Sequence, residues 1–447
     1  MFREVDGTRL RRVLIVCYDF PGIWGAGVIR TYQLAKELPS FGWEPVILTA
    51  QQCPPEEAGN IETSDGRLNS PVIAQLRSRL LVPYETYHHV LTEEERNGAA
   101  PKNGALRQMV KAVTQLAVPD GKIGWVPAAA KRARQIAHDR PFEMCFSVSP
   151  RPTSHFVGWR VARSLGISWV ADYTLPWSDA HWLTARPRPV AWLDRQLERS
   201  VVRAANHITV AYADIAHSIC GRFGAQWERK VSVIPTGFAE DMFDGETPPE
   251  PSKFTILYPG HHFCEEGRYG EWFLRAIDAW IGSNPGLQDK VEFVFTGKLD
   301  PALLRERALM AHPEVIRVEP LISHRACIQA IRSSDVCVVN TVRNRIPGKV
   351  YECMAAGKPV LALSGPGSDL ESLMRGYPKG FAVSPRDIRG ITNFLQQAIQ
   401  RGRSEGSGRS GADKSVEMYS SRKGAQRLSR IFEDLLRSGG ARRGSQL

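Results

Sequence analysis

Short apolar runs of strand length recur along the 447-residue chain, and segments with helical periodicity separate them. The first run, Val13–Cys17, is followed by a glycine-rich loop, by a helical pattern through Val28, Tyr32 and Leu38, and by a second run at 46–49. Strand, loop, helix and strand in this order make a βαβ unit with parallel strands and a right-handed crossover. The sequence therefore predicts an α/β fold built on parallel sheets.

The alternation occurs in two series. The predicted strands are 13–17, 46–49, 144–148, 169–171, 207–210 and 231–234 in the first series, and 254–258, 291–295, 315–318, 336–339 and 359–363 in the second. A stretch rich in Asp, Glu and Pro at 240–251 lies between them. We therefore predict two doubly wound domains, residues 1–236 with an insertion at about 52–130 and residues 237–411, followed by a helix and tail at 412–447.

The charge of the chain favours phosphate-rich partners. Fifty-eight Lys and Arg against 47 Asp and Glu give a net charge of +11 and an isoelectric point near 9.3. Nucleotides, nucleic acid and an anionic membrane surface all fit such a balance. The basic residues are scattered along the sequence, and no RNA- or DNA-binding motif accompanies them, so we expect no nucleic-acid partner.

The cysteine pattern argues against a metal site. The eight cysteines lie far apart, with no CxxC pair and no nearby His at metal-ligand spacing. Cys17, Cys145 and Cys337 fall inside apolar runs, where a thiol is usually a small buried hydrophobe. No signal peptide and no apolar run of about 20 residues is present, so we expect a cytoplasmic protein in a reducing compartment.

Three segments at predicted strand ends of the first domain contain candidate site residues. Gly25 and Gly27 lie in a loop whose backbone N–H groups could approach an anion, although a tight turn without ligand is the simpler explanation of the loop alone. Arg151 and His155 follow the strand at 144–148, and Asp172 ends the next. Each has a structural alternative: a solvated arginine, a core histidine and a capping carboxylate.

The second domain has a candidate site at the segment after its fourth strand. Pro347 suits the first position of a helix, and Gly348 and Lys349 would place N–H groups and a positive charge at the strand ends, where α/β sheets bind ligands. Glu352, one turn on, could accept both hydroxyls of a ribose. The alternative is a Lys–Glu pair on a solvated helix, worth about 0.2–0.5 kcal/mol.

Taken together, these motifs resemble a known family. The matching pieces are Tyr18–Pro21 with its glycine loop and Arg30, Ser149–His155, Val233–Phe238, Tyr258–Gly260 and Gly348–Val360. In order and spacing the chain is similar to the family 4 glycosyltransferases of the GT-B fold, in particular a bacterial branch acting in surface-polysaccharide and related glycoconjugate assembly. The resemblance implies two Rossmann-like domains that face each other across a cleft, and a C-terminal crossover helix that returns to the first.

The resemblance also implies an activity and its residues. The expected enzyme is a retaining transferase that moves a sugar from a nucleotide-diphosphosugar, held by the second domain, to a glycan, lipid-linked or small-molecule acceptor, held by the first. It would need neither a bound metal nor a cofactor. The implied catalytic residues are His155, Glu352, Lys349 and Arg268; the donor-binding residues are Gly25, Gly27, Gly260, Gly348, Lys349, Glu352 and Arg268; the acceptor-side residues are Asp19, Arg30, Arg151 and Asp172.

The chain departs from the family pattern at three places. Many members carry two acidic residues separated by seven positions, but here Asn344 stands before Glu352. An Arg commonly follows the glycine equivalent to Gly260, and Arg268 is the nearest substitute. The branch often has Asp-Phe-Arg-Asp-Pro-Trp where this chain has 172–177 without the Arg and the second Asp. A catalytically weak or inactive GT-B protein that binds nucleotide or glycan, or supports a partner enzyme, is therefore the alternative function.

The insertion in the first domain leaves membrane contact open. Arg77, Arg79, Arg107 and Lys111 lie beside apolar residues, including a helical face at 106–116. A helix with an apolar stripe and cationic flanks can lie on an anionic bilayer, and the other interpretation is that the stripe packs on the domain. The first interpretation predicts a lipid-linked acceptor and peripheral contact with the inner face of the membrane.

Overall fold

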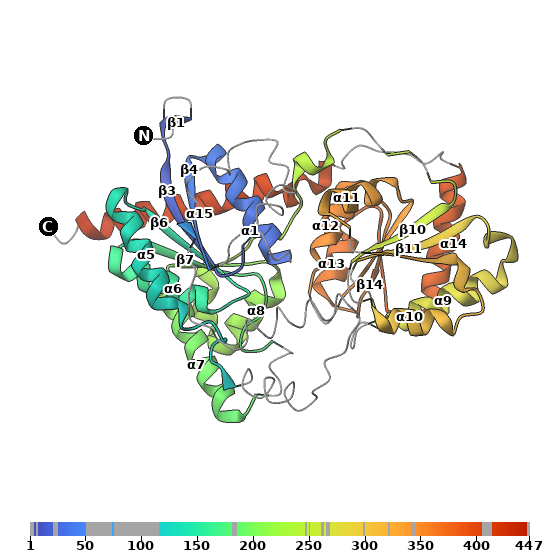
Figure 1. Cartoon of the computed structure of the whole chain (residues 1–447), viewed down its shortest axis with the longest axis horizontal. Helices are drawn as coiled ribbons and strands as arrows, with labels where there is room; N and C mark the ends of the chain where they lie inside the picture. Colours follow the sequence, from blue (N-terminus) through green and yellow to red (C-terminus); the bar gives the residue numbers. More distant parts are fainter. Residues whose placement is uncertain are drawn as a thin grey trace. The chain divides into compact units, whose positions relative to one another are not determined.

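The computed structural model describes residues 4–5, 8–20, 26–50, 74–75, 116–180, 186–245, 248–249, 251–260, 263–264, 269–297, 300–320, 322–341, 345–404 and 414–444. The chain divides into two compact units (Figure 1). Unit 1 comprises Met1–Pro235 and Gly424–Leu447, and unit 2 comprises Thr236–Lys423. The division at 235/236 lies one residue from the predicted boundary, whereas residues 412–423, predicted to belong to the tail, group with unit 2.

Unit 1 contains a parallel sheet in the order β5-β4-β3-β6-β7-β8-β9. The strands are β3 (Arg11–Cys17), β4 (Trp43–Thr49), β5 (Ala74–Gln75), β6 (Met144–Val148), β7 (Ser168–Tyr173), β8 (His207–Val210) and β9 (Val231–Val233). A short antiparallel pair, β1 (Glu4–Val5) and β2 (Thr8–Arg9), precedes them. All six predicted strands form, and the direction of winding reverses between β3 and β6.

Helices cover the unit 1 sheet. They are α1 (Ala26–Glu37), α5 (Trp125–Asp139), α6 (Thr153–Leu165), α7 (Arg188–Ala204), α8 (Ala213–Phe223) and α15 (Ser421–Gly444). The C-terminal helix α15 supplies the buried side chains Ala425, Leu428 and Phe432 to the same core cluster as β3 and α1. The Phe432 ring lies edge-on to Trp43 at 5.0 Å, so the last helix of the chain is part of the core of unit 1.

Unit 2 repeats the plan in the order β12-β11-β10-β13-β14-β15, again all parallel. Its strands are β10 (Phe254–Pro259), β11 (Val291–Thr296), β12 (Ile316–Glu319), β13 (Val336–Asn340), β14 (Val360–Leu363) and β15 (Gly380–Val383), the last of which was not predicted. Its helices are α9 (Gly270–Ser283), α10 (Pro301–Ala308), α11 (His324–Ser333), α12 (Gly348–Ala355), α13 (Asp369–Arg375) and α14 (Ile388–Ser404). Winding reverses between β10 and β13.

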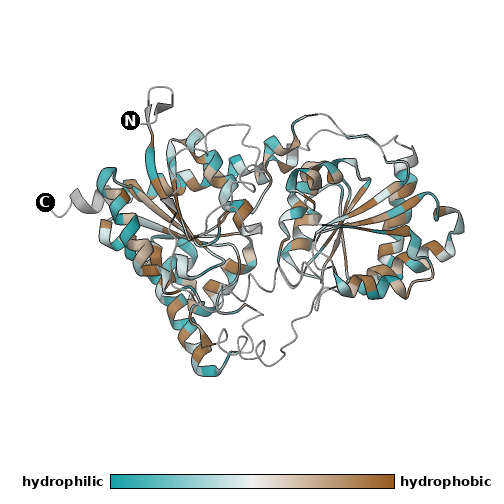
Figure 2. Cartoon of the chain, viewed as in Figure 1, coloured by the Kyte–Doolittle hydropathy of each residue, from teal (hydrophilic) through white to brown (hydrophobic). Residues whose placement is uncertain are grey.

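Both sheets are buried on their two faces, as parallel sheets with helical crossovers must be. Figure 2 shows the central strands of each unit as predominantly apolar. In β3 the four consecutive residues Val13–Val16 are fully buried, which explains why the run is continuous instead of alternating. Cys17, Cys145 and Cys337 are buried as predicted. Among the described helices, none has the length and apolar character needed to cross a membrane.

An ion pair in the interior of unit 1 connects α1 to the sheet. Arg30 Nη1 donates to Asp172 Oδ2 at 2.5 Å, and Arg30 Nη2 donates to the carbonyl oxygen of Ile234 at 2.8 Å. Thr209 Oγ1 donates to the other oxygen of Asp172. The side chains of Arg30 and Asp172 are 1% and 0% exposed, so neither can touch an acceptor. We therefore assign the pair a structural role in place of the predicted acceptor contact.

Removing one partner of this pair is expected to destabilise unit 1 strongly. Arg30→Ala or Asp172→Asn leaves a buried group without its counter-charge, which typically costs about 3–5 kcal/mol. The combination Arg30→Met with Asp172→Leu should cost less than either single change, because no charge remains buried. Hydrogen exchange of the β3 and β6 amides would measure the loss within unit 1. Single variants as stable as the wild type would contradict the structural role.

Candidate functional site

The reversal point of unit 1 contains a small hollow. The ends of β3 and β6 and the start of α1 line it, with Asp19, Gly27 and Arg151 among the lining residues. Arg151 Nε donates to Asp19 Oδ2 at 3.0 Å, so two predicted acceptor-side residues lie together here. Arg151 is 35% exposed and remains accessible to an anion. Ligands of open α/β sheets bind at this type of position.

Gly27 belongs to the same hollow for a steric reason. A Cβ atom there would lie 3.1 Å from Thr174 Oγ1 and 3.5 Å from Pro150 Cδ, because the first turn of α1 approaches the loops after β6 and β7 closely. The predicted partner in the glycine loop, Gly25, lies outside the described residues. The first turn of α1 therefore brings backbone close to the ends of β6 and β7.

His155 does not lie at the surface of this hollow. The side chain is fully buried in the first turn of α6, and its ring stacks on Tyr173 at 4.9 Å. His155 Nδ1 is hydrogen-bonded to Ser147 Oγ at 2.9 Å, and Nε2 is buried without a hydrogen-bond partner among the described residues. Burial lowers the pKa of His155 to about 3, which keeps the ring neutral. The structure thus gives His155 the buried position of the core-histidine interpretation, and its contact with the transferred sugar stays a prediction.

The buried neutral imidazole makes unit 1 sensitive to acid. The folded-state pKa of His155 lies below the ordinary value of 6.5, so the unfolded state binds the proton first and stability falls as pH drops below 6.5. By pH 4 the loss is about 3 kcal/mol. His155→Gln should be less stable at pH 7 and should lose less between pH 6.5 and 4, measured by urea unfolding.

The matched control is His138→Gln, since His138 is 91% exposed. This change should leave both the stability and its pH dependence unchanged. If the stability of His155→Gln fell with pH as steeply as that of the wild type, another group would cause the acid sensitivity.

The reversal point of unit 2 gathers the predicted donor residues. Gly260 follows β10, Asn340 ends β13, and α12 begins at Gly348 directly after Pro347. Among the described residues no side chain caps the N-terminus of α12, so the first N–H groups of the helix keep their capacity to bind an anion. Gly260 and Gly348 therefore lie at one end of the sheet, beside strands that are neighbours in it.

Glu352 lies at the centre of this region with both oxygens hydrogen-bonded. His324 Nε2 lies 2.7 Å from Oε1, and Lys349 Nζ donates to Oε2 at 2.7 Å. Burial alone would raise the pKa of Glu352, but Lys349 and His324 outweigh it and lower the pKa to about 2. For Lys349, burial alone would lower the pKa, but the neighbouring Glu352 carboxylate outweighs it and raises the pKa above its ordinary value. The three side chains form a compact charged cluster.

The structure bears on one alternative for this cluster and adds a residue to it. Glu352 is only 5% exposed, so the alternative of a Lys–Glu pair on a solvated helix does not describe it. His324 was missed entirely, although Ser323 caps α11 by accepting from the Ala326 N–H, and a Ser before a helix is a readable start signal. That signal places His324 in the first turn of α11, but only the tertiary fold brings it to Glu352.

Several predicted residues lie outside the part of the chain that the structure describes. They include Asn344 and Arg268, the substitute for the family's diphosphate-binding Arg. The inserted segment with Arg77, Arg79, Arg107 and Lys111 is also outside them. Their assignments stay predictions.

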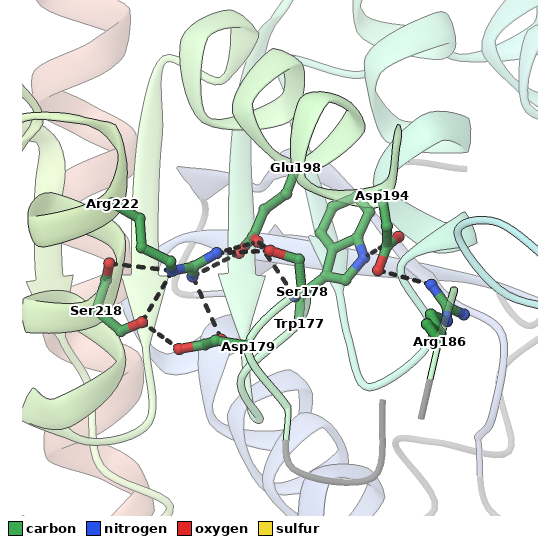
Figure 3. A network of polar contacts seen from close by, with 8 residues as sticks. All are labelled: Trp177, Ser178, Asp179, Arg186, Asp194, Glu198, Ser218 and Arg222. Carbon is green, nitrogen blue, oxygen red and sulfur yellow. Dashed lines mark hydrogen bonds and ion pairs between the residues drawn. The ribbon is translucent and has the colours of Figure 1, made fainter. Parts of the chain in front are cut away.

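A polar network holds the segment after β7 where the chain departs from the branch pattern (Figure 3). Trp177 Nε1 donates to Asp194 Oδ1 at 2.9 Å, and Arg186 Nη1 lies 2.7 Å from Asp194 Oδ2. Ser178 Oγ donates to Glu198 Oε2 at 2.5 Å, and Arg222 Nη1 donates to the same oxygen at 2.6 Å. The network connects the β7–α7 segment to the buried side of α7 and to α8.

Comparison with known proteins agrees with this architecture. Residues 253–401 match the family model described as glycosyl transferases group 1. No curated protein matches the sequence. The solved structure of sucrose-phosphate synthase from Thermosynechococcus elongatus is similar, with a TM-score of 0.61 at 17% identity over 96% of this chain and 100% of the other.

Two further structures share the fold. The N-terminal domain of Candida albicans trehalose-6-phosphate phosphatase matches with a TM-score of 0.59 at 11% identity, covering 98% of both chains. An S. aureus structure, the MnaA-UDP co-structure, matches with a TM-score of 0.51 at 13% identity over 94% of this chain and 95% of the other. The chain has the two-unit Rossmann-like GT-B fold. The matched segment, which contains Glu352 and Lys349, supports a glycosyltransferase in general terms.

The charged cluster should contribute to the stability of unit 2 in a pH-dependent way. The folded-state pKa of Glu352 is lowered from 4.5 to about 2, so its contribution is present above pH 4.5 and is lost as pH falls towards 2. At neutral pH the contribution is on the order of 3 kcal/mol. Glu352→Gln should therefore destabilise unit 2 at pH 7. The difference in free energy of unfolding between this variant and the wild type, measured by denaturant unfolding, should become smaller below pH 4.5.

Proposed function

We propose that the protein is a retaining, metal-independent glycosyltransferase of the family 4 type. Unit 2 binds a nucleotide-diphosphosugar, and unit 1 binds the glycan, lipid-linked or small-molecule acceptor. The single observation that carries this proposal is the Glu352–Lys349–His324 cluster at the reversal point of unit 2, inside the segment that matches group 1 glycosyl transferases. The bacterial polysaccharide branch, which rests on the sequence resemblance, and a cytoplasmic location, which rests on the cysteine pattern, are part of the same proposal.

The chemistry of the cluster suits a nucleoside diphosphate. A carboxylate whose pKa lies near 2 is ionised at neutral pH and accepts hydrogen bonds only, which suits the two hydroxyls of a ribose. Lys349 is 28% exposed at the side chain and can turn from Glu352 towards a phosphate. With the N–H groups of the first turn of α12, it would stabilise the charge that grows on a departing diphosphate.

Binding would then involve an exchange of partners. Each oxygen of Glu352 is engaged by one side chain and Glu352 is only 5% exposed, so access for a ribose opens when one of these side chains moves. Lys349 is the partner that a phosphate would recruit, while His324 would keep the carboxylate oriented. The similar S. aureus MnaA structure is a complex with UDP, which makes UDP the first ligand to test.

The alternative function is a GT-B protein that binds a nucleotide or glycan, or supports a partner enzyme, without turnover. The observation that favours it is the closed state of the cluster, in which Lys349 and His324 already satisfy Glu352. Nucleotide binding without hydrolysis or transfer of a nucleotide-sugar would select this alternative.

Nucleoside diphosphates should stabilise the folded chain, and the affinity should depend on the Glu352–Lys349–His324 cluster. A ligand at a hundredfold excess over its dissociation constant adds about 2.7 kcal/mol to stability, visible as a shift in melting temperature. Glu352→Gln and Lys349→Ala should each weaken nucleotide binding about tenfold or more, because a hydrogen bond to a charged group is lost. Nucleotide-sugar hydrolysis should fall with them and should be unaffected by a chelator.

The matched control is Glu371→Gln, which breaks the exposed pair with Arg375 on α13 of the same unit. This control should leave nucleotide binding unchanged. His324→Ala should weaken binding while His324→Gln, which keeps a donor for Glu352, should restore most of it. Binding that is unaltered in Glu352→Gln would refute the donor site, and a rate that collapses on chelation would refute metal independence.

A further inference from the structure

Three neighbouring helices of unit 1 present a cationic outer face. Helix α6 packs against both α5 and α7, and the three follow one another along one side of the unit in Figure 1. The exposed basic side chains are Lys131, Arg132 and Arg134 on α5, Arg160 and Arg163 on α6, and Arg188, Arg195, Arg199 and Arg203 on α7. The one exposed acidic side chain on these fully described helices is Asp139. Basic residues that are scattered in the sequence are thus gathered by the fold.

The exposed charges of α7 are all positive, because both acidic residues of the helix are buried. Asp194 and Glu198 are 1% and 0% exposed and pair with Arg186 and Arg222 in the network of Figure 3. The exposed side carries the four arginines of α7, Arg188, Arg195, Arg199 and Arg203, spaced seven, four and four positions apart, which places them along one helical face. No acidic side chain of the helix offsets them.

Apolar side chains interrupt this face near the start of α7. Trp192 is 61% exposed and Leu193 is 45% exposed, and Trp192 shares the helical face of the arginines. Leu116, 58% exposed, lies on a segment that Arg186 holds through the carbonyl oxygens of Ala117 and Pro119. Ile123, 43% exposed, follows on the same segment. Of the exposed large hydrophobic side chains described in unit 1, only Val233 lies elsewhere in the sequence.

We infer that the exposed face of α7, which we call the α7 face and define by Arg188, Trp192, Leu193, Arg195, Arg199 and Arg203, docks unit 1 onto an anionic lipid bilayer. Arginines attract acidic headgroups, and Trp and Leu insert at the boundary between headgroups and acyl chains. The inference rests on the proposed function and deepens it, by giving unit 1 a surface from which to take a lipid-linked acceptor. It does not depend on the basic residues of the insertion, Arg77, Arg79, Arg107 and Lys111.

The apolar residues decide between a bilayer and a nucleic acid. A polyanion such as RNA would use the arginines and could stack a base on Trp192, but it offers nothing to Leu193, Leu116 or Ile123. A bilayer accepts both kinds of side chain, because it combines negative charge with an apolar layer directly beneath. The observations therefore favour the membrane.

Co-sedimentation with vesicles tests the inference. The full chain should bind vesicles of phosphatidylcholine with phosphatidylglycerol at low salt, should leave them at high salt, and should ignore pure phosphatidylcholine. Arg195→Ala with Arg199→Ala should lower the partition coefficient about 30-fold, since each arginine near the surface contributes about a factor of five. Trp192→Ser with Leu193→Ser should lower it about tenfold with all charges kept.

Matched controls come from unit 2. Arg305→Ala with Arg389→Ala removes two exposed arginines, and Leu309→Ser removes a leucine that is 80% exposed. Both controls should bind vesicles as the wild type does. Failure of the wild type to bind, or equal losses in the control variants, would overturn the inference. Stronger binding to single-stranded RNA than to the vesicles, unaffected by the Trp192 and Leu193 changes, would overturn it in favour of a polyanion surface.

Nucleotide binding measured on the same variants separates this inference from the proposed function. The α7-face variants should bind nucleoside diphosphates normally, because the cluster around Glu352 belongs to unit 2. Vesicle binding without any nucleotide binding would leave the α7 face in place and refute the donor site. Nucleotide binding without vesicle binding would leave the donor site in place and refute the docking role of the α7 face.

Discussion

Parallel strand pairing is the constraint from which the rest of this structure follows. Each pair of adjacent parallel strands needs a crossover, and a right-handed crossover places a helix over the sheet. All strands of a sheet then end at the same edge, and the polar residues that follow them are brought together there. Where the winding reverses, between β3 and β6 and between β10 and β13, the crossovers leave opposite faces and a crevice opens. Both candidate regions lie at these two points.

The buried charges divide into those that hold the fold and those that remain available. Arg30 and Asp172 are 1% and 0% exposed, so no ligand can compete for either side chain. Lys349 and Glu352 make the same kind of contact at 2.7 Å, but the lysine is 28% exposed and lies in the first turn of α12. The difference in access, and not the strength of the pairing, separates a structural ion pair from a candidate binding group.

The sequence predicted the strands of the two sheets better than the contacts of the candidate site residues. Continuous apolar runs identified eleven strands, because a strand buried on both faces must be apolar throughout. The strand β15, Gly380–Val383, escaped because only Val383 of its four residues is buried. His155 and Arg30 were placed in the correct local segments, but their burial depends on Tyr173, Asp172 and other residues far away in sequence. The contact of His324 with Glu352 is likewise purely tertiary, since 28 positions separate them.

The position of α15 has a consequence for how the molecule is made. Unit 2 is one continuous stretch of chain, whereas unit 1 lacks part of its core until Ala425, Leu428 and Phe432 have been synthesised. On a ribosome, domains generally form in order from the N-terminus. Here the order is reversed, because unit 2 can fold before unit 1 is complete. Trp43 and Phe146 lack their packing partner Phe432 until α15 has been synthesised. In a nascent chain, Trp43 and Phe146 therefore gain their contacts with Phe432 only when almost the whole chain has been translated.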